Sequence, residues 1–257
     1  MFKLVLMYKC LFISNIDLLT KITTMKKIKT IIFCLIATFG FSQVPSFTVV
    51  YLDAKPFQQN EIAEKFDNFY KDVEFNSGGV YLEKLNRGNT MGTHRVVFFG
   101  DSANWGMKEG QKERIQRGMF WRNVNDHVES WGDKYSGRIL DYNGEVAPDH
   151  YGYIQIYDIA VSDPEKFLAA HKKIVSQARG LMEDRPVAFG TYDIGSPNGA
   201  THWVAVGYKN IGDNIVMKSK IEQQLAKEWK EYYKNRGEVL SKGNFDLNIL
   251  RTYGSFN

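Results

Sequence analysis

The chain has 257 residues, with 33 lysines and arginines against 29 aspartates and glutamates, and a formal net charge of +4. Residues 1–42 carry six of the lysines and one aspartate, so the rest of the chain has a net charge of −1. Such a chain lacks the basic surface that attracts nucleic acids or anionic membranes, so neither is a predicted partner. Both cysteines, Cys10 and Cys34, also lie in this segment, which excludes a disulfide or thiolate metal site in 43–257.

The segment that starts at Met25 has the three parts of a secretory signal peptide. Three lysines open it, an apolar run of 11 residues covers 31–41, and the small residue Ser42 suits cleavage after it. The run is too short for a stable membrane-spanning helix, although a retained N-terminal anchor helix is the alternative. We therefore predict a presequence over 1–42, translation from Met25, and a secreted or periplasmic protein that is free of the membrane after cleavage.

A Thr-His pair opens an apolar strand twice in this chain, 108 positions apart. The first copy reads THRVVFF over 93–99, and the second reads THWVAV over 201–206. Each follows a turn rich in Gly and Asn, and an Ile-Leu pair follows 46 or 48 residues later. This period is too long for a solenoid unit, so it predicts one small domain that was duplicated and fused, with repeats over 44–145 and 150–257.

Hydrophobic periodicity and turn residues predict the elements of the first repeat. The repeat begins with an alternating strand, and a helix with an apolar stripe follows. The expected elements are a strand over 47–53, a helix with N-cap Asn60 that Gly78-Gly79 ends, strands over 80–85 and 93–99, a helical region to about Trp131, and a strand over 138–142.

The second repeat is predicted to have the same order of elements. Its first helix has a strong start signal, because Ser162-Asp163-Pro164-Glu165 combines a capping box with an early proline. The expected elements are a strand over 153–159, a helix with a buried stripe over 167–182, strands over 187–194 and 201–206, a helix marked by Ile221, Leu225, Trp229 and Tyr232, and a strand over 248–253.

This order predicts an α+β protein made of two ferredoxin-like βαββαβ units. Helices cover one face of each antiparallel sheet, so the two bare faces are expected to pack on each other as a barrel with helices outside. In the strand over 153–159, we assign Ile154 and Ile156 to the helix side. We assign Tyr153, Gln155 and Tyr157 to the interior, because ligand cavities combine apolar surface with hydrogen-bonding groups. An exposed edge strand is the alternative.

The Thr-His stretches over 93–101 and 201–206, with the element order around them, resemble the dimeric α/β-barrel superfamily, and most of all its stress-responsive A/B-barrel type. The resemblance covers nearly all of 47–254 and implies that one chain builds the pseudo-dimeric barrel that members usually build from two. The superfamily includes cofactor-free oxygenases, isomerases, cyclases and haem enzymes, so the fold does not name the function. A His-Pro-x-x-His-like stretch, which catalytic cyclases carry after the third strand, is missing at 102–106 and 211–214.

Histidines are the main candidates for chemistry. His94 and His202 would occupy equivalent places in the two repeats and could bind a ligand or transfer a proton. Alternatively, each Thr-His pair bonds nearby backbone and holds the strand entry. His171 lies inside the apolar stripe of its helix, where it could bind haem or a metal; the alternative is a core histidine bonded to a residue such as Tyr157. His127, on another predicted helix, is a similar haem candidate, and no metal motif such as H-E-x-x-H is present.

We predict that the protein binds a small aromatic or hydrophobic molecule in a cavity between sheet and helices. One alternative is a cofactor-free oxygenase, isomerase or cyclase that uses His94 or His202 as acid and base. Others are a haem-binding barrel and an interaction protein that uses the fold as a scaffold. The sequence indicates no catalytic residues, ligand identity or oligomeric state. The candidate ligand-binding residues are His94, His202, Tyr51, Tyr153, Tyr157, Trp203 and His171.

Overall fold

A computed structural model describes residues 44–88 and 92–255, which contain nine β-strands and five α-helices. They belong to one unit, Val44–Asn257. The predicted presequence, 1–42, lies outside the described residues. Within the described ranges, no helix combines the length and the apolar character that crossing a membrane requires.

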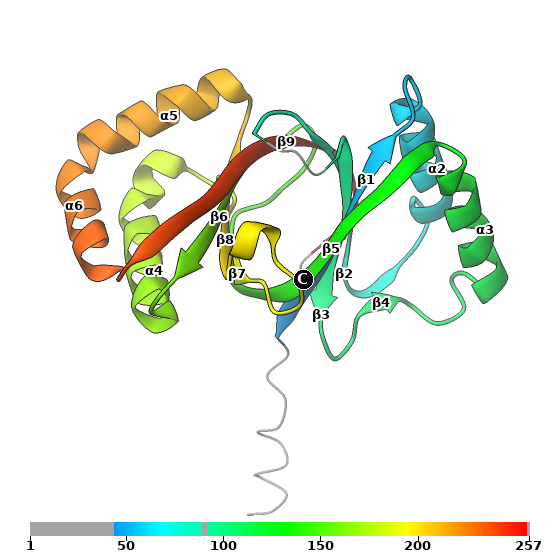
Figure 1. Ribbon diagram of the computed structural model, residues 1–257, viewed down its shortest axis with the longest axis horizontal. Coiled ribbons are helices and arrows are strands. Elements are labelled where there is room, and N and C mark those ends of the chain that lie inside the picture. The colour runs from blue at the N-terminus through cyan, green and yellow to red at the C-terminus, as the bar shows by residue number, and fades with distance from the viewer. Residues whose placement is uncertain (1–43, 89–91, 256–257) are drawn as a thin grey trace, which may run out of the picture. The chain divides into compact units, whose positions relative to one another are not determined.

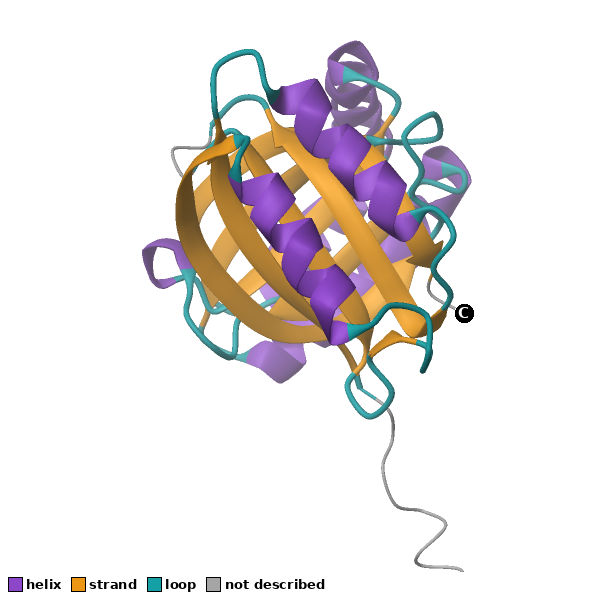
Figure 2. Ribbon diagram, turned by 90° about the vertical axis from the view of Figure 1, so that its right-hand side faces the viewer, coloured by secondary structure: helices purple, strands orange, loops and turns teal. Residues whose placement is uncertain are grey.

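The strands form one antiparallel sheet in the order β3-β1-β5-β7-β8-β6-β9-β2-β4. Because β3 also pairs with β2, eight strands close into a ring, which Figure 2 shows as a barrel with helices outside. The strands are β1 (Pro45–Ala54), β2 (Phe75–Leu85), β3 (His94–Asp101), β4 (Gly106–Met107), β5 (Val128–Asn143), β6 (Tyr153–Val161), β7 (Val187–Thr191), β8 (His202–Tyr208) and β9 (Val239–Ser255).

The helices cover the barrel on two sides (Figure 1). Two helices cover the first half of the unit and three cover the second. They are α2 (Gln59–Tyr70) and α3 (Arg114–Asn125) in the first half, and α4 (Pro164–Met182), α5 (Ile211–Gln224) and α6 (Ala226–Asn235) in the second, with a short 3₁₀ turn at Pro197–Gly199.

The predicted α+β class is confirmed. Within the first half the strands pair in the order β5-β1-β3-β2, and within the second in the order β9-β6-β8-β7. The long strands β5 and β9 join the halves, because β5 pairs with β1 and then β7, and β9 pairs with β6 and then β2. Where β5 passes from β1 to β7, Gly137 permits the close approach, since a Cβ there would lie 1.8 Å from the Thr191 carbonyl oxygen.

Several predicted boundaries were wrong. Gly78-Gly79 does not end a helix but lies within β2, where a Cβ on Gly79 would come 1.8 Å from the Tyr253 oxygen of β9. The second helical region ends at Asn125, and Trp131 lies in β5 opposite Leu52 of β1. Long-range strand pairing thus outweighs an apparent helical spacing of apolar residues.

The helix starts and the last strand also differ in part from the prediction. The N-cap position of α2 is Gln58, so Asn60 is inside the helix. α4 begins in the predicted stretch, but its N-cap is Asp163, which accepts a bond from the Lys166 N–H at 3.0 Å, and not Ser162 as the predicted capping box requires. β9 begins at Val239, nine residues before the predicted strand. The predicted last helix is two helices, α5 and α6, divided at Leu225.

The two faces of β6 are the reverse of the prediction. Ile154 and Ile156 pack inside the barrel with residues of β1 and β9. Tyr153 packs outside against α4, and Tyr157 lies among residues that contact the helices. The alternation was read correctly, but period-two spacing cannot say which face turns inward.

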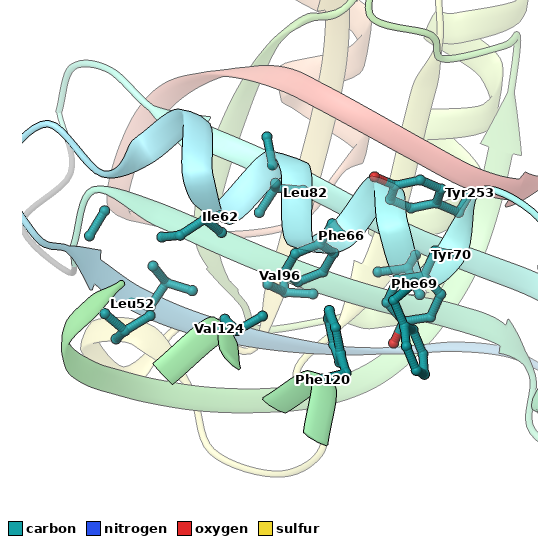
Figure 3. Packing of buried hydrophobic residues seen from close by; sticks show 14 residues of the cluster. Leu52, Ile62, Phe66, Phe69, Tyr70, Leu82, Val96, Phe120, Val124 and Tyr253 are labelled. Atoms are coloured by element: carbon teal, nitrogen blue, oxygen red, sulfur yellow. The ribbon is translucent and has the colours of Figure 1, made fainter. Parts of the chain in front are cut away.

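The outer layer of the first half is a dense aromatic core between α2, α3 and the sheet (Figure 3). Phe66 is fully buried, and its ring centroid lies 5.1 Å from that of Phe120 and 5.7 Å from that of Tyr70. Phe69 stacks on Phe120 at 4.4 Å. This layer therefore holds α2 and α3 on the barrel.

We expect Phe66→Ala to lower the free energy of unfolding by about 3–5 kcal/mol, because it removes a ring from a packed core and leaves a cavity. Chemical denaturation followed by circular dichroism measures this loss. Phe57→Ala is the control, since that side chain is 93% exposed and the change should cost little. Equal losses in the two variants would contradict the prediction.

Candidate functional site

A groove of about 830 Å³ lies between the outer face of β6, β7 and β8 and the helices α4, α5 and α6. Its volume falls in the range of small-molecule pockets, which are mostly apolar with a few polar groups. Seven of the residues that line this groove have aromatic or imidazole rings: Tyr157, Phe167, His171, Tyr208, Trp229, Tyr232 and Tyr233. We call it the α4–α6 groove.

The helix α6 forms the outer wall of this groove. It has no fully buried residue, although Trp229, Tyr232 and Tyr233 all line the groove. The Trp229 ring lies 5.1 Å from that of Tyr232 and 5.6 Å from that of Tyr233. The corresponding layer of the first half is packed with rings, so the two sides of the barrel differ in how fully the helices cover the sheet.

His171, from α4, is a buried polar residue in the groove wall. The residue is 4% exposed, and its ring stacks on Phe167 at 5.9 Å between centroids. Burial, and next the charge of Lys172, lower the pKa of this imidazole to about 4, so the ring is neutral near pH 7. Its Nε2 atom has no hydrogen-bond partner among the described residues, so the predicted bond to Tyr157 is not formed at this atom.

A second polar atom in the groove wall also lacks a partner. The Trp229 Nε1 donor is buried and makes no hydrogen bond within the described ranges. Buried polar groups are normally bonded, and each orphaned group costs about 1–3 kcal/mol. Two residues of the groove wall, His171 and Trp229, thus each carry one buried polar atom without a partner among the described residues.

The rim of the groove is mainly cationic. Lys218 donates to Gln155 Oε1 at 2.6 Å and lies 5.5 Å from the Tyr157 ring centroid, while Arg236 lies 4.6 Å from that of Tyr233. Lys230 also lines the groove. Glu222 is the acidic residue among the lining residues of the groove. Gln155 is thus committed to the helix side, where its carbonyl also accepts from Asn214 at 2.9 Å.

The Thr-His pairs form the same local arrangement twice. His94 Nδ1 lies 2.9 Å from Thr93 Oγ1, and that oxygen accepts from the Ala54 N–H at 2.8 Å. In the second half, His202 Nδ1 lies 2.8 Å from Thr201 Oγ1, which accepts from the backbone of β6 at 3.0 Å. Both pairs therefore hold a strand entry, the local role that the sequence offered as the alternative.

Neither of these histidines lines the α4–α6 groove. Burial lowers the pKa of His94 to about 4, and burial and Arg138 also lower that of His202. The His202 ring stacks on Phe189 at 5.3 Å, and Phe189 lies 5.3 Å from His171. His202 is thus one ring away from the groove. A ligand-binding role for either strand-opening histidine stays a prediction.

His127 lies at the other side of the barrel. Its Nδ1 is 2.7 Å from Gln58 Oε1, and it does not line the groove. In the part of the chain that the structure describes, no three His, Cys, Asp or Glu residues gather closely enough to hold a metal ion.

The predicted residues Tyr51 and Trp203 lie inside the barrel, so they do not meet His171. Tyr51 is fully buried and accepts from Arg95 Nη1 at 3.3 Å, and Arg95 pairs with Glu83. Asp158 of β6 is 3% exposed and accepts from the Tyr192 hydroxyl at 2.7 Å. Burial raises the pKa of this carboxyl, while Tyr192 and Arg95 oppose the change.

This buried network and several groove residues were not predicted from the sequence. The available signal was Arg95 itself, the charged residue in the apolar strand over 93–99. Because charged residues are almost never fully buried unless they are paired, its position indicates a buried acidic partner. Tyr208 and Tyr232 gave no such signal, since aromatic residues at these spacings also fit a filled core.

Comparison with known proteins shows the fold alone. No family model matches the chain, and no curated protein matches it. A proposed monooxygenase from Lactobacillus acidophilus NCFM aligns with a TM-score of 0.59 and 15% identity, over 83% of this chain and 98% of that protein. A proposed monooxygenase from Fusobacterium nucleatum aligns with a TM-score of 0.56 and 15% identity, over 84% and 97%. These likenesses support the predicted dimeric α/β-barrel fold.

The buried His171 should make stability depend on pH. Its folded pKa of about 4 lies below the unfolded value of about 6.5, so the unfolded chain binds more protons between these values. The free energy of unfolding should therefore fall as pH is lowered from about 6.5 to 4, by up to about 1.4 kcal/mol per pH unit from this residue. We expect His171→Leu to reduce this slope in denaturation measured across that range.

The neighbouring variant Phe167→Leu is the control for this measurement. It alters the same packing without removing a titrating group, so its effect should be nearly constant over the pH range. An unchanged slope in His171→Leu would show that this imidazole is not held neutral by the fold.

Proposed function

We propose that this protein binds a flat, largely apolar small molecule in the α4–α6 groove. The observation that carries the proposal is the pair of buried, unpartnered polar atoms, His171 Nε2 and Trp229 Nε1, in the wall of a cavity of about 830 Å³. An apolar body would cover the aromatic wall, and the two polar atoms would set its orientation. The cationic rim favours a ligand with an acidic group at one end.

The proposal also covers the export of the protein and the origin of its two repeats. We propose that residues 1–42 direct secretion and that the repeats over 44–145 and 150–257 arose by duplication. The equivalent Thr-His contacts and the same strand order in each half support the duplication. The stress-responsive A/B-barrel type stays a proposal based on the Thr-His stretches.

The groove can be blocked from its outer wall without disturbing the core. Ala226 lines the groove from α6 and is exposed, so Ala226→Trp should fill space at the mouth while the protein stays folded. With 8-anilino-1-naphthalenesulfonate as a fluorescent aromatic anion, we expect binding by the unchanged protein and at least about tenfold weaker binding by this variant. Gln223→Trp on α5 is the matched control, since Gln223 is exposed and outside the groove.

The same comparison identifies a natural ligand. Small molecules extracted from the purified protein and analysed by mass spectrometry should include one that is present with Gln223→Trp and depleted with Ala226→Trp. Equal probe binding by the two variants would contradict the proposal, because the probe would then occupy another surface.

Haem is a second candidate for the occupant. The groove fits it in three respects, because its volume suffices, His171 offers a free imidazole nitrogen, and Lys218, Lys230 and Arg236 could pair with carboxylates. His171 would hold the iron, and the bound group would supply redox chemistry. A cofactor-free oxygenase, isomerase or cyclase with His94 or His202 as acid and base has less support, since neither histidine lines the groove.

Titration with haemin separates these candidates. If haem is the ligand, a sharp Soret band should appear at one equivalent and should shift or vanish in His171→Ala. His94→Ala, which alters a buried histidine outside the groove, should leave the band unchanged. A Soret band that His171→Ala does not affect, or none at all, removes haem and leaves the apolar ligand.

A further inference from the structure

Lys218 of α5 lines the α4–α6 groove, and its charged end lies beside β6. The residue is half-buried, and Tyr157 of β6 lines the same groove. The ammonium donates to the Gln155 Oε1 atom at 2.6 Å and lies 5.5 Å from the centroid of the Tyr157 ring. The positive charge is therefore held between α5 and the outer face of the sheet, where a ligand in the groove would lie.

The positive charge of Lys218 has no acidic partner within the described residues. Its bonded partner, Gln155 Oε1, is the oxygen of a neutral amide, which also accepts from Asn214 at 2.9 Å. Glu222 lines the groove one turn further along α5, yet it forms no ion pair with Lys218 in the described part of the chain. A charge taken partly out of water without a countercharge is costly, and only one of the three ammonium N–H donors bonds a protein atom.

The other lysine and the arginine that line the groove are placed differently. Arg236 is the C-cap residue of α6, where the helix dipole stabilises a cation, and its guanidinium lies 5.3 Å from the ring centroid of Tyr232 and 4.6 Å from that of Tyr233. Lys230 is exposed, so water and salt screen its charge. Lys218 is thus the half-buried cation that lies between the helices and the sheet.

We propose that the groove selects a flat aromatic acid over its neutral counterpart, and that Lys218 binds the acid group. This inference rests on the proposed function, because it names the chemical class of ligand that the same groove takes. An acid group bound to the ammonium lies beside the Tyr157 ring, which suits a carboxylate or sulfonate attached directly to an aromatic ring. It supplies the missing countercharge through charge-assisted hydrogen bonds, which are about twice as strong as neutral ones.

Two fluorescent probes with the same ring skeleton test this selection. 8-Anilino-1-naphthalenesulfonate carries a sulfonate that the neutral N-phenyl-1-naphthylamine lacks, so the ratio of their dissociation constants measures the preference for the acid group. We expect Lys218→Met to lower this preference by at least about fivefold, because a hydrogen bond to a charged group is lost. The affinity for the neutral probe should stay within about twofold, since methionine keeps much of the apolar stem.

Lys220→Met is the matched control for this measurement. Lys220 lies on the same helix, is exposed and does not line the groove, so this variant removes the same charge from the surface and should leave the preference unchanged. Lys218→Gln is a second neutral variant that keeps the test decisive if Lys218→Met fails to fold, because its amide can still donate to Gln155.

The proposal is overturned if Lys218→Met keeps the preference for the sulfonate, or if Lys220→Met lowers it equally. The outcome with Ala226→Trp separates this inference from the proposed function. If that variant blocks both probes while Lys218→Met leaves their ratio unchanged, this inference fails and the proposed function stands. If it blocks neither probe, the groove is not the binding site and both fail.

Discussion

The strands β5 and β9 each pair with one half of the barrel through their first residues and with the other half through their last. This double pairing closes the sheet and leaves no long edge strand in the ring. Closure also separates the two faces of every strand, because one row of side chains must enter the interior and the other must meet helices. The places of the groove and of the buried charges both depend on that separation.

The two helix layers use the same outer surface in different ways. On the first side, rings such as Phe66 and Phe120 fill the space between helices and sheet. On the second side, the helical segment that follows β8 is divided at Leu225 into α5 and α6. A groove of about 830 Å³ remains between these helices, α4 and the sheet. The two helix layers thus differ, because packed rings fill the first and the second encloses a groove.

The predicted site residues lie in different parts of the barrel. His171 and Tyr157 line the groove, Tyr51 lies inside the barrel with Trp203, and the strand-opening histidines bond their neighbouring threonines. The apolar alternation of β6 was visible in the sequence, yet the side that carries Ile154 turned inward, against expectation. Alternation has a period but no direction, so it cannot distinguish an interior face from one that helices cover.

The sequence by itself determined the features that depend on near neighbours. These are the α+β order of elements, the start of α4 within 162–165 and the repeated Thr-His arrangement, because caps and adjacent side chains interact over a few residues. Only the tertiary structure decided the ring of strands, the burial of Arg95 beside Glu83, and the free nitrogen of His171. These depend on contacts between residues far apart in the chain, whose registers and packing no local pattern specifies.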